Sequence, residues 1–228
     1  MKHQLPKLST TETVLGIAFL FAQMLLIPIA IGLFLLLFRI RVTEAELNAL
    51  CFGANFVCAI VIFHGYWRRS VRALADRWLS VLGTALKYFV LNYGATILLN
   101  ILILRLDPDF ANANDQSIAA MTADAKWLIS ICVVLLVPPV EEILYRGIVF
   151  GKLYEKSRFW GYFVSVVLFA SIHVLGYIGT VSPTRLLLCF LQYVPPGYCL
   201  ARAYCRSGNL FAPILMHSAI NLIAVLLM

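Results

Sequence analysis

Charged residues are scarce in this chain, since Asp, Glu, Lys and Arg together make up 13% of its 228 residues. A soluble globular domain carries about 25% charged and about 45–50% apolar residues, whereas 62% of this sequence is hydrophobic. The sequence also lacks internal repeats, low-complexity segments and any stretch polar enough to form a soluble domain. This composition excludes an ordinary soluble protein and indicates a membrane protein with several spans.

Cysteine pairs of the C-x-x-C type are absent, although the chain contains 6 cysteines, so neither a disulfide framework nor a zinc framework is indicated. Most of these cysteines lie in apolar runs, where they act as small hydrophobic residues. The formal charge is +7, but the basic residues are dispersed among short loops and form no long tail. In a membrane protein such an excess first indicates topology, so we expect no nucleic-acid partner.

Apolar runs long enough to cross a bilayer, which takes about 20 mostly apolar residues, follow one another along the chain. The first run is longer than the h-region of a signal peptide, about 7–15 residues, and no small-residue cleavage site follows it, so we expect it to be retained. The expected fold class is all-α, a polytopic transmembrane helix bundle of seven spans, or eight if one is hidden. The seven runs are 13–38, 46–66, 79–104, 127–150, 159–179, 185–204 and 209–228.

The distribution of basic residues among the loops predicts the orientation of the bundle, because Lys and Arg are enriched on the cytoplasmic side. Basic residues flank the N-terminus and follow the second, fourth and sixth runs: Lys2, Lys7, Arg68, Arg69, Arg72, Arg77, Lys152, Lys156, Arg158, Arg202 and Arg206. Loop 105–126 contains Asp107, Asp109, Asp115 and Asp124, and we expect it outside. Arg39 and Arg41 are exceptions, since this orientation places them outside as well.

Three ionisable residues, Glu141, Glu142 and Arg146, lie within the apolar run 127–150. Ionisable groups at bilayer depth are costly, and by default they indicate a functional site. Glu142 and Arg146 are spaced i,i+4 and can form an ion pair on one helix face, which also permits a purely structural role. Glu141 points about 100° away from Glu142, and a structural ion pair does not explain it.

Two further runs place polar side chains at a similar depth. Counted from the cytoplasmic helix ends at helical rise, Glu141 lies roughly 15 Å deep, His173 roughly 21 Å, His217 roughly 12 Å and Asn221 roughly 18 Å. Each histidine or asparagine alone could be an interhelical hydrogen-bonding residue. Because three helices bring their strongly polar groups to one level, we expect one shared site.

Prolines precede the carboxylates and also interrupt the sixth run. Pro138 and Pro139 remove backbone donors from the helix, so we expect a local opening that admits water and exposes carbonyl groups to a protein cavity. The segment Pro195-Pro196-Gly197 predicts a kink.

The motifs Glu141-Glu142-x-x-x-Arg146, Phe169-x-x-x-His173 and His217-x-x-x-Asn221 resemble those of the CAAX-protease and bacteriocin-processing family of intramembrane endopeptidases. The resemblance covers residues 125–228, which we expect to form the catalytic region. Residues 1–124 then supply N-terminal transmembrane helices without a recognised motif. Members of this family often have eight helices, and Tyr145 stands where Phe is common.

The resemblance implies hydrolysis of a peptide bond by a glutamate-activated water. It implies that Glu141 and His173 activate the water, that His217 and Asn221 donate hydrogen bonds to the oxyanion, and that Glu142 and Arg146 support the site. No cofactor is expected. Zn²⁺ bound by the two histidines and one glutamate is the alternative, although the sequence contains no H-E-x-x-H motif.

Two other classes of function remain open on the sequence alone. The polar cluster could bind a partner in a non-catalytic immunity or scaffold protein, or it could form a transport or proton pathway. The expected partners of the enzyme are the lipid bilayer and a peptide or membrane-protein substrate. A short chain of this kind is similar to the bacterial members, so we expect a multi-pass protein of the bacterial plasma membrane. The sequence does not predict the substrate or the oligomeric state.

Overall fold

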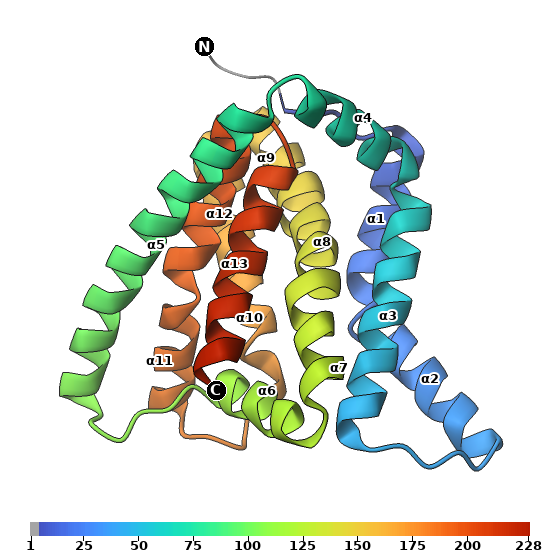
Figure 1. Cartoon of the computed structure of the whole chain (residues 1–228), viewed down its shortest axis with the longest axis vertical. Helices are drawn as coiled ribbons and strands as arrows, with labels where there is room; N and C mark the ends of the chain where they lie inside the picture. Colours follow the sequence, from blue (N-terminus) through green and yellow to red (C-terminus); the bar gives the residue numbers. More distant parts are fainter. Residues whose placement is uncertain (1–4) are drawn as a thin grey trace.

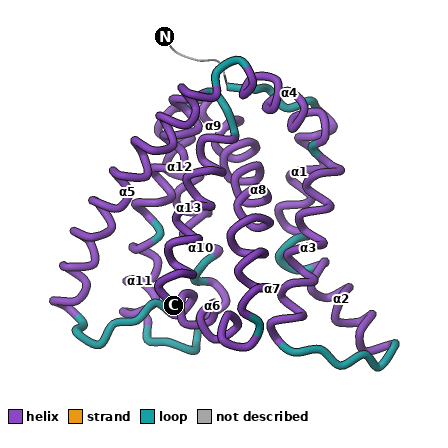
Figure 2. The backbone as a smooth tube through the Cα atoms, in the orientation of Figure 1, coloured by secondary structure: helices purple, strands orange, loops and turns teal. Residues whose placement is uncertain are grey.

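The computed structural model describes residues 5–228, and within that range the chain is an all-helical bundle without a β-strand (Figures 1 and 2). Lys2 lies outside the described residues. The α-helices are α1 (Thr10–Ala22), α2 (Leu26–Leu37), α3 (Glu44–Ile62), α4 (His64–Ala75), α5 (Trp78–Leu106), α6 (Ala113–Asp124), α7 (Lys126–Ile131), α8 (Val137–Glu142), α9 (Gly151–Lys156), α10 (Arg158–Ile172), α11 (Pro183–Gln192), α12 (Val194–Ser207) and α13 (Phe211–Leu227). Two π-helical segments, η1 (Cys132–Leu136) and η2 (Ile143–Phe150), and the 3₁₀ turn η3 (Leu175–Tyr177) complete the structure. The predicted all-α class is confirmed.

Three helices of the described range are long and apolar enough to cross a membrane: α3, α5 and the continuous segment Lys126–Lys156. Helices α1 and α2 meet at an angle of 57° and would add a fourth span if they are counted together. The remaining predicted runs form the shorter apolar helices α10 and α13 and the interrupted pair α11 and α12. The chain is a membrane protein, and its predicted number of seven spans stays a prediction.

Several predicted runs end earlier than their hydrophobicity suggests. The run 159–179 is helical only as far as Ile172, so His173 caps the helix instead of lying within it. The chain then turns through η3 and Gly179, whose φ of 84° is a left-handed conformation that glycine adopts without strain. The run 185–204 breaks at Tyr193 because Pro195 and its neighbour are tolerated only in the first turn of a helix.

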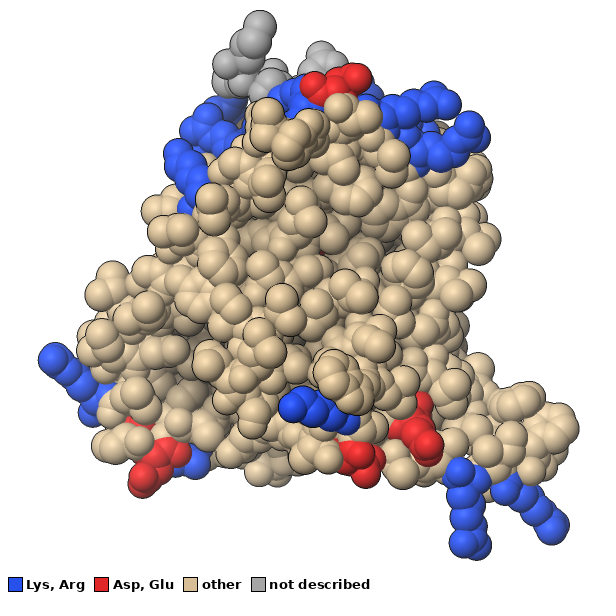
Figure 3. All heavy atoms as spheres, viewed as in Figure 1, with Lys and Arg blue, Asp and Glu red and all other residues tan. Residues whose placement is uncertain are grey.

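The basic residues gather at one end of the bundle. Figure 3 shows Lys and Arg concentrated at the end that carries α4 and α9, whereas acidic and basic residues are mixed at the end that carries α6. Helix α4 is a separate helix at this end, and Glu12 of α1 holds it by accepting from the backbone N–H of Tyr66 at 2.6 Å and from Arg69 at 2.7 Å. This arrangement agrees with the predicted grouping of the loops, and which end faces the cytoplasm stays a prediction.

The segment Lys126–Lys156 stands at the centre of the bundle (Figure 1). All eight residues of η2 are buried, and α1, α10 and α12 pack against this segment. The close approach of α1 depends on Gly16, where a Cβ atom would collide with the side chains of Ile148 and Phe63. The first motif therefore lies in the most buried of the three candidate spans of the described range.

Candidate active site

The prolines before the carboxylates change the hydrogen bonding of the central helix. The N–H of Val137 donates to the carbonyl of Cys132, which is the i→i+5 pattern of a π-helix. In that register the carbonyl of Val133 would accept from position 138, where proline has no N–H. The side-chain amide of Asn221 on α13 donates to this carbonyl at 2.7 Å. The expected carbonyl that faces the cavity is therefore present, and Asn221 binds it.

Glu142 lies at the centre of a buried polar cluster. Its side chain and that of Arg146 have no exposed surface, and Oε2 lies 3.2 Å from Arg146 Nε, as their i,i+4 spacing predicts. Oε1 of Glu142 lies 2.8 Å from Nδ1 of His217, which ties the central helix to α13. Arg146 also donates to the carbonyl of Gly197 at 3.1 Å and lies over the ring of Phe169. These contacts link α8, η2, α12 and α13.

Glu141 points to the other face and lines a cavity of about 440 Å³. Its Oε2 atom lies 3.9 Å from Nε2 of His173 and 4.0 Å from Nε2 of His217. These distances are too long for direct hydrogen bonds, and within the described residues the buried Oε2 atom has no hydrogen-bond partner. One carboxylate and two imidazoles thus converge on one point.

The partners of the two Nδ1 atoms fix the tautomers of the imidazole rings. Nδ1 of His173 lies 2.7 Å from the carbonyl of Phe169, and a carbonyl can only accept, so Nδ1 carries the proton. Nδ1 of His217 faces the carboxylate of Glu142, which is paired with Arg146, and therefore also carries a proton. In the neutral state each ring presents the lone pair of Nε2 towards Glu141.

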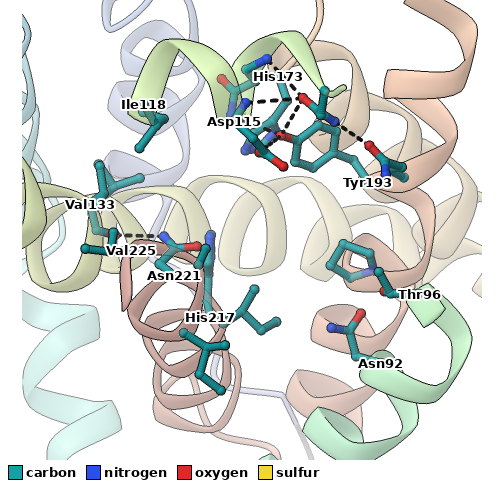
Figure 4. A pocket seen from close by; sticks show the side chains of 18 of the residues that line it. Asn92, Thr96, Asp115, Ile118, Val133, His173, Tyr193, His217, Asn221 and Val225 are labelled. Carbon is teal, nitrogen blue, oxygen red and sulfur yellow. Dashed lines mark hydrogen bonds between the residues drawn. The ribbon is translucent and has the colours of Figure 1, made fainter. Parts of the chain in front are cut away.

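Sequence reasoning missed Tyr193, which contacts His173, and the two residues that hold the hydroxyl of Tyr193. The ring of Tyr193 stacks on His173 with centroids 4.2 Å apart and an angle of 22°. The hydroxyl of Tyr193 donates to Asp115 at 3.1 Å and accepts from the amide of Asn114 at 3.0 Å (Figure 4). No spacing in the sequence relates Tyr193 to His173, because the contact depends on the break between α11 and α12.

The cavity brings together all four of the predicted catalytic side chains, Glu141, His173, His217 and Asn221. Its walls also include polar residues of α5 and of the segment around α6, and its lining extends to Met228 (Figure 4). The cavity therefore reaches from the carboxylate cluster towards the end of the bundle that carries α6.

The arrangement does not fit a zinc site. Among residues 5–228, no group of three His, Cys, Asp or Glu side chains is placed to hold a metal ion. Ligands about 2.0–2.1 Å from a tetrahedral zinc lie roughly 3.4 Å from one another. Glu141 is 3.9 and 4.0 Å from the two histidines, so the set would have to contract around an ion. The expectation that no cofactor is required stays a prediction.

Comparison with known proteins identifies the same region. Residues 123–223 match a family model described as "Type II CAAX prenyl endopeptidase Rce1-like". A protein of Bacillus subtilis (strain 168) named "Putative membrane peptidase YdiL" is 33% identical over 91 residues, which is 40% of this chain and 33% of that relative. The match therefore spans about a third of the relative's length, and no solved structure matches the chain significantly. The matched family region contains all six candidate residues, from Glu141 to Asn221.

Proposed function

We propose, from the similarity of residues 123–223 to the CAAX prenyl endopeptidase family model, that this protein is a membrane-embedded endopeptidase that uses water activated by Glu141. The observation that carries this proposal is the convergence on Glu141 of two Nε2 atoms, from His173 at 3.9 Å and His217 at 4.0 Å. A carboxylate facing a cavity between two imidazoles is suited to bind and deprotonate one water molecule.

In the proposed reaction, the water oxygen attacks the carbonyl carbon of the peptide while its proton moves to the carboxylate of Glu141. Nε2 of His173, which carries a lone pair, is the second acceptor at the water. The tetrahedral intermediate collapses when the C–N bond breaks, and the proton passes from Glu141 to the leaving amine. The products are a carboxylic acid and an amine, so the step requires no further reactant.

The negative charge on the oxygen of the intermediate needs hydrogen-bond donors. Asn221 uses one N–H for the carbonyl of Val133 and retains a second. His217 can donate through Nε2 only as an imidazolium, whose Nδ1–H points to the carboxylate of Glu142 at 2.8 Å. We assign Glu142 and Arg146 the role of positioning His217 and the central helix.

The proposed substrate is a peptide or a segment of a membrane protein. Sites for small ligands have volumes of about 300–1,000 Å³, so a cavity of about 440 Å³ holds a short stretch of chain. Because the cavity lies inside a transmembrane helix bundle, the substrate must enter it either along the helices or sideways from the lipid.

The test compares the purified full chain with Glu141→Gln on a library of quenched fluorescent peptides in nanodiscs. Glu155→Gln on α9, an exposed carboxylate that does not line the cavity, is the matched control. Loss of a general base typically costs about 10²–10⁴-fold in rate, so we expect cleavage to fall by that factor only in Glu141→Gln. Cleavage that persists in Glu141→Gln would overturn the proposal.

The same assay with a strong chelator tests the role of metal. We expect cleavage to be unaffected by the chelator. Loss of cleavage that added Zn²⁺ restores would replace the glutamate mechanism by a zinc mechanism with the same residues.

A further inference from the structure

Helix α5 presents a stripe of polar side chains that the three motifs do not include. Asn92, Thr96 and Asn100 are spaced i, i+4 and i+8, so they lie on one face of the helix. All three line the cavity that contains Glu141 and His173. Apart from Tyr93, the residues between them are apolar, and α5 as a whole qualifies as a membrane span. Polar groups at this depth are costly and by default functional.

Two side chains of the stripe have polar atoms that are buried and unpaired. In the part of the chain that the structure describes, neither Oδ1 of Asn92 nor Oγ1 of Thr96 has a hydrogen-bond partner. Asn92 as a whole residue is in addition only 3% exposed. Oδ1 of Asn100, by contrast, accepts from the amide of Gln192 at 2.7 Å. Unpaired buried polar atoms require an explanation, and because Asn92 and Thr96 also line the cavity, their free oxygens point to a ligand that supplies hydrogen bonds there.

The spacing of the stripe matches an extended polypeptide. Four residues of helix rise about 6 Å, and two residues of an extended strand rise about 6.6–6.8 Å. Successive polar groups on α5 can therefore meet every second main-chain amide of a peptide that runs beside the helix. From Asn92 to Asn100 the stripe covers about 12 Å, the length of roughly four extended residues.

We propose that Asn92, Thr96 and Asn100, the α5 ladder, bind the main chain of an extended and uncharged segment of the substrate. Figure 4 shows Asn92 and Thr96 on α5 on one side of the cavity, with His217 and Asn221 of α13 on the other. A segment held by the ladder lies alongside the polar cluster. Neutral amide and hydroxyl groups select main-chain N–H and C=O groups, and most of the remaining lining is apolar, so apolar side chains fit beside them.

The proposed ligand of the α5 ladder is the peptide substrate, so this inference rests on the proposed peptidase function. Binding of a peptide to the ladder can nevertheless be measured without cleavage. The probe is a fluorescent decapeptide library with apolar side chains and blocked ends, bound to full-length Glu141→Gln in nanodiscs and followed by anisotropy against empty nanodiscs. Asn92→Leu and Thr96→Val are added to this background. Since each removes one neutral hydrogen bond, we expect each to weaken binding about five- to tenfold.

Matched controls separate the loss of the α5 ladder from the general effect of replacing a polar side chain by an apolar one. Asn55→Leu removes an amide on α3 whose buried Oδ1 also lacks a partner within residues 5–228, but Asn55 does not line the cavity. Thr84→Val removes a hydroxyl of α5 that donates to the carbonyl of Ser80. We expect both controls to bind the library as the background does, and thermal unfolding verifies that all variants are folded.

A second series of probes replaces single peptide amides by esters, which removes one main-chain N–H. An ester at the position that faces Asn92 should weaken binding to the background protein. It should have little further effect on binding to Asn92→Leu, because that substitution has already removed the other partner of the same hydrogen bond. Equal losses in all variants, binding of Asn92→Leu and Thr96→Val at the level of the controls, or no binding to the background protein would each overturn the ladder.

The results also distinguish the ladder from the proposed reaction. Library binding that depends on Asn92, together with wild-type protein that does not cleave, would retain the ladder and reject the peptidase. Cleavage that depends on Glu141 but has an unchanged KM in Asn92→Leu would retain the peptidase and reject the ladder.

Discussion

Nδ1 of His217 lies 2.8 Å from Oε1 of Glu142, and this contact joins the first and third motifs inside the protein. The same carboxylate pairs with Arg146, and both side chains of that pair have no exposed surface. Glu142 is therefore shared between an imidazole and a guanidinium. The two contacts give Glu142 a structural and a positioning role, which substitution can separate.

Replacing Glu142 by Gln should destabilise the protein because it leaves the guanidinium of Arg146 buried without its carboxylate. Breaking a buried ion pair from one side typically costs about 3–5 kcal/mol. In the double variant Glu142→Gln, Arg146→Gln, no unpaired charge remains, so we expect part of that stability to return while cleavage stays low. Thermal unfolding and cleavage rates in detergent provide the two measurements. A double variant no more stable than Glu142→Gln alone would contradict this account.

Tyr193 should act on the reaction through the orientation of His173, since the two rings stack at 4.2 Å. Tyr193→Phe keeps the stack and loses the hydrogen bonds to Asp115 and Asn114, so we expect a change in kcat of less than threefold. Tyr193→Leu removes the stack, which is worth about 0.5–1.5 kcal/mol. We expect a kcat about three- to tenfold lower and an unchanged KM. Equal values of kcat for Tyr193→Phe and Tyr193→Leu would show that the stacking of Tyr193 on His173 does not contribute to the reaction rate.

The local part of the site could be predicted from the sequence, because helical spacing fixes which neighbours share a face. The pairing of Glu142 with Arg146 and the cavity-facing position of Glu141 follow from the 3.6-residue repeat. The freed carbonyl of Val133 follows only in part, because an α-helical repeat would leave the carbonyl of Val134 without the N–H that Pro138 lacks, and the π-helical register moves this position to Val133. The matched depths of the polar groups predicted one shared site, and the family resemblance, which the match over residues 123–223 supports, implied the role of each residue.

The rest depends on how helices end and meet, which spacing does not determine. His173 caps α10 because the chain turns immediately after Ile172, although the apolar run continues. The contact of His173 with Tyr193 needs that turn and a second break before Pro195. The stripe on α5 did carry a signal, the four-residue spacing from Asn92, but only the cavity gives that spacing a meaning.

Gly16 should be essential for the packing of α1 on the central helix. A Cβ atom at this position would meet the side chain of Ile148 and two atoms of the Phe63 ring, at 2.7 and 2.9 Å. Overpacking of this kind costs about 1–3 kcal/mol, so Gly16→Ala should lower the thermal midpoint. Gly32→Ala on α2, where nothing lies within 4 Å of the added atom, is the control and should be neutral or slightly stabilising. Equal midpoints for both variants would refute the packing argument.

Asp107 and Arg185 should stabilise the protein in a pH-dependent manner. Arg185 donates to both carboxylate oxygens of Asp107, at 2.6 and 2.9 Å. This hydrogen bonding lowers the pKa of Asp107 below its ordinary value of 3.8. A carboxyl whose pKa is lower in the folded state adds stability above its unfolded pKa, and that stability is lost as the pH falls through the folded pKa.

We therefore expect Asp107→Asn to lower the thermal midpoint at pH 7, and the difference from wild type to shrink as the pH is lowered below 3.8. Asp124→Asn, at the far end of α6, is the control. Thermal unfolding across a pH series gives the result, and a difference that does not change with pH would exclude the ion pair as its cause.

The position of the cavity mouth makes the orientation of the bundle a functional question. The cavity lining includes Asn112 and Asp115, so it extends towards the α6 end, opposite to the basic end with α4 and α9 (Figure 3). Because positive residues favour the cytoplasm, we expect the mouth to face away from it. In a cysteine-free background, Gln116→Cys should react with a membrane-impermeant maleimide on intact bacterial cells. Lys156→Cys should react only after permeabilisation, and the reverse pattern would mean that the substrate approaches from the cytoplasm.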